Sequence, residues 1–314
     1  MPDTNDPAWE RKLIEKLALD ALTEQRRRRR WGIFFKLLGF AYLTVLLVVA
    51  VDWGGGDRLG DGKPHTALVQ MTGVIREKGD ANAEHMLNGL QSAFEDKGTK
   101  GVILLINSPG GSPVQAGIIN DEMHRLRAKY PNIPLYAVVE DLCASGGYYV
   151  AVAADKIFVD KASIVGSIGV LMDGFGFVGT MDKLGVERRL LTAGSNKGFL
   201  DPFSPQNNDQ KSHAQQMLNE IHQQFIEVVR KGRGKRLKET PDMFSGLMWT
   251  GAKSVELGLA DGFGSVESVA RDVIKADDIR DYTVKPNLAE KFAKQFGASM
   301  AEGAVGLLDR FSLR

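Results

Sequence analysis

Residues 143–151 read "CASGGYYVA" and follow directly on an apolar run at 135–139. Small residues at the end of a strand let the chain turn sharply into a helix, and this alone is a compact way to pack. The same turn would present the hydroxyl of Ser145 at the edge of a sheet. The turn therefore has two interpretations. Ser145 is either a helix N-cap beside two closely packed glycines, or a nucleophile.

Two more turns of small residues follow apolar stretches, "NSPGGS" at 107–112 and "VGSIG" at 165–169. In a parallel sheet such turns gather at the carboxyl ends of the strands, where ligands bind. Glycine permits positive φ and a close approach of the backbone. We therefore expect the N–H groups of Gly111 and Gly146 to form an oxyanion hole, helped by the start of a helix after Ser145.

Apolar runs alternate with helical patterns along most of the chain, which predicts an α/β fold with parallel strands and crossover helices. The expected strands are 66–75, 101–107, 134–140, 156–160 and 187–193. The expected helices are 82–97, 116–126, 148–154, 206–231, 252–258 and the last thirty residues.

The N-terminal part has five arginines at 26–30, followed by a stretch at 31–51 that is apolar except for Lys36. That length suffices to cross a bilayer, and the arginines should remain in the cytoplasm. A cleaved secretory signal is the alternative, but no Ala-x-Ala pattern follows the apolar stretch. The predicted organisation is a cytoplasmic tail (1–30), a transmembrane helix (31–51), a linker (52–64), a main domain (65–275) and a helical C-terminal extension (276–314).

The composition narrows the classes of function. The chain has 314 residues, a net charge of +1 and one cysteine, Cys143, so it forms no internal disulfide. It has no Cys/His cluster with metal-ligand spacing, and we expect neither a metal nor a cofactor. The basic run at 230–238 has no interleaved aromatic residue, so a solvated helix end is expected there and no nucleic-acid binding.

A nucleophilic serine needs a base. The histidines fall in the linker or on expected helices, and none is expected at a strand end. Lys197, in "TAGSNKGFLDPFSP" at 192–205, could act as a base if its surroundings kept it neutral; otherwise it is a solvated loop lysine. Cys143 is the rival nucleophile, but its apolar flanks predict a buried, inert thiol.

Residues 66–275 resemble the signal peptide peptidase A family of membrane-anchored serine peptidases. The matching stretches, in the family's order and spacing, are "INSPGG", "ASGGYYVAVAAD", "VGSIGV", "SNKGFLDPFSP" and "WTGAKSVELGLADGFG". The resemblance implies a Clp-protease/crotonase-like fold, a superhelix of repeated β-β-α units, in the short, single-repeat form. It also implies that Ser145 is the nucleophile, that Lys197 is the general base, and that Ser167 orients the lysine.

The expected function is therefore that of a membrane-anchored serine endopeptidase with a Ser-Lys dyad. By resemblance, its substrates are released signal peptides and other membrane-proximal unstructured polypeptides outside the cytoplasm, at the bacterial inner membrane. We also expect a homo-oligomeric ring in which neighbouring subunits share the dyad. Two alternatives remain: a crotonase-type acyl-CoA enzyme, and a non-catalytic membrane scaffold that has kept the fold.

Overall fold

The computed structural model describes residues 7–54 and 62–284 and divides the chain into two compact units, 1–59 and 60–314. In the first unit, α1 (Pro7–Gly54) is one continuous helix of 48 residues, so the expected tail and apolar stretch belong to the same element. Among the residues described, no helix has a stretch that is both long enough and apolar enough to cross a bilayer. Most of the expected linker falls on 55–61, outside the described residues.

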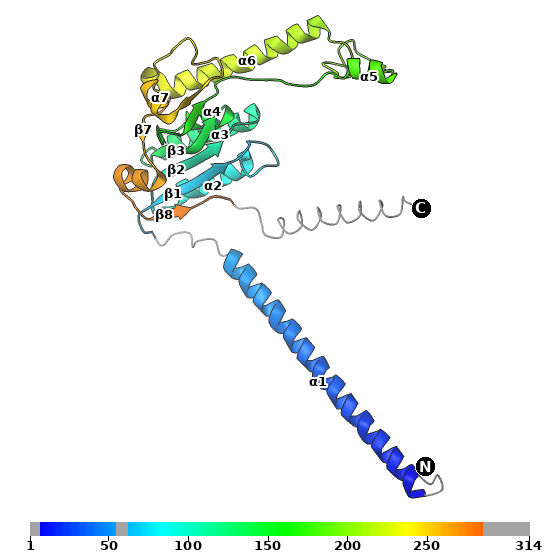
Figure 1. Ribbon diagram of the computed structural model, residues 1–314. Helices are drawn as coiled ribbons and strands as arrows, with labels where there is room; N and C mark the ends of the chain where they lie inside the picture. Colours follow the sequence, from blue (N-terminus) through cyan, green and yellow to red (C-terminus); the bar gives the residue numbers. More distant parts are fainter. Residues whose placement is uncertain (1–6, 55–61, 285–314) are drawn as a thin grey trace. The chain divides into compact units, whose positions relative to one another are not determined.

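The second unit is built on a mainly parallel sheet (Figure 1). Its strands run in the order β6-β5-β3-β2-β1-β8, while β4 pairs with β3 and β7. Among these pairs only β5 and β6 are antiparallel. The alternation of strands and helices predicted from the sequence is confirmed. The strands are β1 (His65–Thr72), β2 (Thr99–Ser108), β3 (Leu135–Ala144), β4 (Lys156–Val159), β5 (Ile164–Gly166), β6 (Met248–Thr250), β7 (Gly262–Phe263) and β8 (Ile279–Asp281).

The two faces of the sheet are covered by different helices, because successive side chains of a strand point to opposite faces. One face, which includes Val69 and Leu104, packs against α2 (Ala83–Glu95), α3 (Pro113–Lys129) and α4 (Gly146–Ala151). The other face, which includes Ile103 and Val138, packs against α8 (Val266–Ser268) and the π-helix η2 (Val269–Ile274).

The long helix α6 (Asn208–Arg233) joins the sheet layers to a projecting segment that contains α5 (Val178–Leu184). Figure 1 shows α5 beyond the N-terminal end of α6, away from the sheet. The C-terminal half of α6 packs against α4, where the rings of Phe225 and Tyr149 are 5.2 Å apart. After α6 come the short 3-10 helix η1 (Gly234–Arg236) and α7 (Gly251–Glu256).

Three expectations about the elements need correction. Residues 187–193 form no strand, because this exposed segment has no neighbouring strand to satisfy its backbone groups. The helix after Ser145 begins earlier than expected, at Gly146, and ends at Ala151. Residues 279–281 are β8, paired in parallel with β1, so the sheet continues into the expected C-terminal extension. The helix expected in the last thirty residues lies outside the described residues.

Candidate active site

Ser145 lies between the end of β3 and the start of α4, in a backbone conformation that is rare for a residue with a side chain. Its φ is 52° and its ψ is −123°. Its N–H donates to the carbonyl oxygen of Gly166 at 2.8 Å. Its side chain makes no capping hydrogen bond, so the defining contact of an N-cap is missing. The strained turn instead places Ser145, which is half-buried, at the carboxyl edge of the sheet.

The loop after β2 packs directly against this turn, and only glycine fits there. A Cβ atom on Gly110 would lie 2.6 Å from the nitrogen of Gly146 and 2.7 Å from the Cβ of Ser145. Ile75 holds the loop in place. Its N–H donates to the carbonyl oxygen of Gly110, and its carbonyl oxygen accepts from Ser112, both at 2.8 Å. The sequence had indicated close backbone approach by the glycine pair, and the structure identifies Gly110 as the residue in contact with the serine turn.

Two N–H groups lie side by side next to Ser145. A Cβ atom on Gly146 would be 3.2 Å from the nitrogen of Gly111. Among the described residues, neither N–H has a hydrogen-bond acceptor. Two free donors beside a hydroxyl can stabilise an oxyanion. Because α4 has only six residues, these individual N–H groups matter more than the helix dipole.

Ser167 occupies the equivalent position on the neighbouring strand. Gly166 of β5 pairs with Ala144 of β3, so Ser167 and Ser145 each follow a paired residue. Ser167 also has a φ of 52°, and its N–H donates to the carbonyl oxygen of Leu247 at 2.7 Å. The fold therefore brings four of the expected site residues together at one edge of the sheet: Ser145, Gly146, Gly111 and Ser167.

The fifth expected residue, Lys197, lies elsewhere within the same chain. It is exposed, and its side chain contacts no partner in the part of the chain that the structure describes. The adjacent Asn196 accepts a hydrogen bond from Gln210, in the first turn of α6, at 3.2 Å. Tyr149, on the helix that follows Ser145, instead contacts Phe225. Gln210 and Phe225 are fifteen positions apart on α6, which corresponds to about 22 Å along a helix.

Two other side chains near the turn bear on the chemistry. The thiol of Cys143 is fully buried, and burial raises its pKa well above the usual range, so it is a poor nucleophile. His222, which the sequence did not single out, has its Nε2 3.2 Å from the carbonyl oxygen of Ile168. Because a carbonyl oxygen only accepts, Nε2 is the donor in this contact. Nothing in the sequence indicated this contact with Ile168, because His222 lies on a helix among polar residues.

Comparison with known proteins identifies the family. The model of peptidase family S49 matches residues 127–280. A protein named after signal peptide peptidase, SppA of Enterococcus faecium, is 31% identical over 238 residues, which are 73% of this chain and 69% of that protein. The chain belongs to peptidase family S49, the signal peptide peptidase A family. The resemblance inferred from the five sequence stretches is thus confirmed.

Other similarities are partial. A protein of Brucella melitensis named Na(+)/H(+) antiporter NhaA is 42% identical over 216 residues. The match covers 69% of this chain but only 29% of that protein. Among solved structures, a mutant of the 1510-N membrane-bound stomatin-specific protease with a substrate peptide has a TM-score of 0.48 and 14% identity. That match covers 74% of this chain and 98% of the other.

Proposed function

We propose that this member of the family is a serine endopeptidase in which Ser145 attacks a peptide carbonyl. The observation that carries the proposal is the strained Ser145 turn, with the free N–H groups of Gly111 and Gly146 beside the hydroxyl. An N-cap would not need the strain, and close packing would not leave two donors without acceptors.

The reaction proceeds in two steps. The Oγ of Ser145 bonds to the carbonyl carbon while a neutral Lys197 amine takes the hydroxyl proton. The N–H groups of Gly111 and Gly146 hold the resulting oxyanion, and Lys197 then passes the proton to the leaving amine as the peptide bond breaks. Water next attacks the acyl-Ser145 ester, with Lys197 as base, to release the carboxylate product and restore the serine. By family resemblance, Ser167 would orient the amine of Lys197.

Lys197 would come from a neighbouring subunit. Within one chain, α6 separates the segment of Lys197 from the serine turn by about 22 Å, whereas proton transfer needs a contact of about 3 Å. A lysine that acts as general base also needs an enclosed site, because burial favours the neutral amine. A second copy that covers Lys197 would satisfy both requirements.

The projecting segment 170–207 has the character of an interface. It exposes large apolar side chains to an extent that a monomeric soluble domain rarely tolerates. Leu191 is 96% exposed and Phe175 is 80% exposed. Residues 187–193, expected as a strand, could find their missing partner on another subunit. A head-to-tail contact of this kind closes into a ring if the rotation permits, and we propose such a homo-oligomer.

Family membership and the N-terminal arginine cluster support the remaining parts of the proposal. The substrates would be released signal peptides and other unstructured polypeptides near the membrane. Residues 31–51 would anchor the chain in the bacterial inner membrane, with the N-terminus in the cytoplasm and the peptidase domain outside. The peptidase domain would have the Clp-protease/crotonase-like fold, a superhelix of repeated β-β-α units.

A fluorophosphonate probe tests the nucleophile directly, because only an activated serine displaces the fluoride. We expect the probe to label Ser145 in the full chain, with labelling and peptide hydrolysis both lost in Ser145→Ala. A Cys143→Ala variant serves as the matched control at the adjacent strand end and should still be labelled. An acyl-CoA enzyme or a non-catalytic scaffold would give no labelled serine, and hydrolysis that persists in Ser145→Ala would exclude this assignment.

A further inference from the structure

A cavity of about 700 Å³ opens on the face of the sheet opposite to α2 and α3. We call it the acidic groove. Its floor is apolar and includes Leu105, Val138, Phe263 and Val266. Phe263 is 50% exposed, although it lies in a strand. The helices α8 and η2 cover most of this face, where Val138 is buried and Leu105 and Val266 are half-buried. Phe263 remains the exposed part of the floor, with the Nζ of Lys161 5.9 Å from the centre of its ring.

The rim of the acidic groove carries four carboxylates: Glu140, Asp141, Asp160 and Glu267. One cation, Lys161, lines the same cavity. None of the four carboxylates forms an ion pair with any residue that the structure describes. Asn107 holds two of them close together, since its Nδ2 donates to Glu140 and Asp141 at 3.2 Å each. The rim thus sets four carboxylates against one cation, and none of the four is held in an ion pair among the described residues.

We propose that the acidic groove is a second peptide-binding site, for segments in which Lys or Arg side chains adjoin a run of apolar residues. The basic side chains would contact the rim carboxylates, and the apolar residues would cover Phe263 and the half-buried side chains beside it. The inference rests on the proposed peptidase function, because it assigns to the same enzyme a preference among its substrates.

The position of the acidic groove suits this role. Residues 138–141 of β3 line it, and the same strand continues to Ala144 and then Ser145. Ile164 of β5 also lines it, two residues before the Gly166 that anchors the serine turn. Four residues of extended chain from Asp141 to Ser145 span about 13 Å. A polypeptide that lies in the groove and runs in the direction of β3 would bring its next few residues near Ser145.

Peptide binding to the full chain in detergent tests the site. All variants are made in a Ser145→Ala background so that the probe stays intact. The probe is a fluorescein-labelled peptide, Lys-Lys followed by four Leu-Ala repeats, measured by fluorescence anisotropy. We expect Glu140→Lys with Glu267→Lys to weaken binding by about tenfold or more, because two attractions become repulsions. Added salt should weaken binding to the unreversed protein.

The matched control is Glu84→Lys with Asp121→Lys, which changes the net charge equally on exposed residues of α2 and α3. It should bind the probe as before. Phe263→Ser, which adds no charge, should also weaken binding and covers the case in which the reversed variant fails to fold. A comparison peptide with Glu-Glu in place of Lys-Lys should bind at least tenfold more weakly.

Three results would overturn the proposal: equal weakening in the control, equal binding of the Glu-Glu peptide, or a change of oligomeric mass in the reversed variant without any peptide binding. The last result would make the acidic groove an interface between copies of the chain. Cleavage of the probe by Ser145→Ala would count against the nucleophile assignment instead, and would leave the binding comparison intact.

Discussion

At the scale of single residues, the serine turn depends on backbone conformations that most side chains avoid. Ser145 and Ser167 both have a φ of 52°, and Gly110 has a φ of 96°. The hydrogen bond from Ser145 to Gly166 and the contacts of Ile75 with the glycine loop hold these conformations in place. Strain of this kind persists only where the surroundings over-determine the backbone, and here they do so around one hydroxyl.

Gly110→Ala should remove most of the activity. The new Cβ would lie 2.6 Å from the nitrogen of Gly146 and would displace or cover that donor. Loss of one oxyanion donor typically lowers kcat by about a hundredfold, which initial rates on an unstructured peptide would measure. Gly117→Ala on α3 is the control, because its Cβ would meet nothing within 4 Å and should leave the rate unchanged. Wild-type turnover in Gly110→Ala would show that the contact is not needed.

Lys197→Arg should be inactive, because a guanidinium cannot accept a proton near neutral pH. His222→Gln is the informative comparison, since His222 lies near Ile168 while Lys197 is remote from Ser145 in one chain. We expect His222→Gln to retain activity within a few-fold. An active Lys197→Arg together with an inactive His222→Gln would transfer the role of base to the histidine. The activity of both variants would be measured as the rate of peptide hydrolysis over a range of pH.

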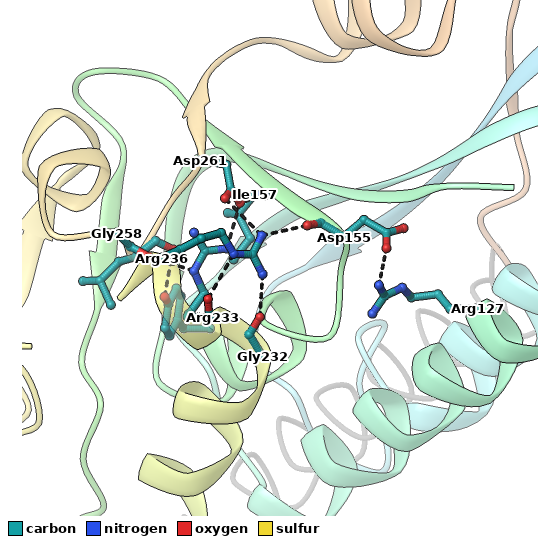
Figure 2. Close-up of polar contacts among 10 residues, drawn as sticks. Arg127, Asp155, Ile157, Gly232, Arg233, Arg236, Gly258 and Asp261 are labelled. Atoms are coloured by element: carbon teal, nitrogen blue, oxygen red, sulfur yellow. Dashed lines mark hydrogen bonds and ion pairs between the residues drawn. The ribbon is translucent and has the colours of Figure 1, made fainter. Parts of the chain in front are cut away.

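At the scale of elements, a buried charge cluster fixes the C-terminal end of α6 (Figure 2). Arg233 is 1% exposed, and its guanidinium donates to Asp261 at 2.7 Å and to the carbonyl oxygen of Gly258 at 2.8 Å. Arg236 adds bonds to Asp261 and to the carbonyl oxygens of Asp155 and Gly232. The cluster ties α6 to the start of β4 and to the chain before β7, and so positions the helix against which α4 packs.

Arg233→Met should destabilise the domain by about 3 kcal/mol, because it leaves the Asp261 carboxylate largely buried with only one cationic partner. Chemical denaturation followed by circular dichroism would measure the change. The control is Arg230→Met, three positions before Arg233 on the same helix, which breaks an exposed ion pair with Glu239. It should lower the free energy of unfolding by no more than about 1 kcal/mol. Equal effects of the two substitutions would mean that burial of the pair is unimportant.

The same cluster predicts a dependence of stability on pH. Burial by itself raises the pKa of Asp261, but the hydrogen bond and charge of Arg233, the N–H of Ile157 and the charge of Arg236 outweigh it and hold the pKa below 3.8. A carboxyl with a lowered folded-state pKa stabilises the protein above its ordinary pKa and loses that contribution as pH falls through the folded value.

Asp261→Asn should therefore be less stable than the wild type at neutral pH, and the difference should shrink as the pH falls below 3.8. Unfolding midpoints in urea at neutral and acidic pH would measure it. A difference that stays constant across this range would mean that the carboxylate charge is not what stabilises the cluster.

At the scale of the whole molecule, the proposed dyad requires Ser145 of one subunit to meet Lys197 of another. The projecting segment and the length of α6 keep them apart within one chain. Mixed subunits of Ser145→Ala and Lys197→Ala, each inactive alone, should regain part of the activity, because some junctions then pair an intact serine with an intact lysine. Differently tagged subunits would confirm that mixed oligomers form. Mixed oligomers without any recovered activity would place the dyad within one chain.

The sequence by itself determined the features that depend on local chemistry. The alternation of strands and helices, the serine turn at the end of β3 and the glycine loop after β2 follow from hydrophobic periodicity and from small residues at fixed positions. The family could also be identified from such stretches, because its motifs are local. Even the start of α6 was predictable, since Asn207 caps it with its side chain.

The tertiary structure decided what depends on contacts between distant residues. Residues 187–193 have strand-like composition but no neighbour to pair with, whereas β8 exists because β1 offers it an edge. The separation of Ser145 from Lys197 and the approach of His222 to Ile168 follow from how α6 packs against α4. The acidic groove follows from how α8 and η2 pack on the sheet. Local propensity does not encode these contacts, because their free energy arises only when separate elements bury one another's surfaces.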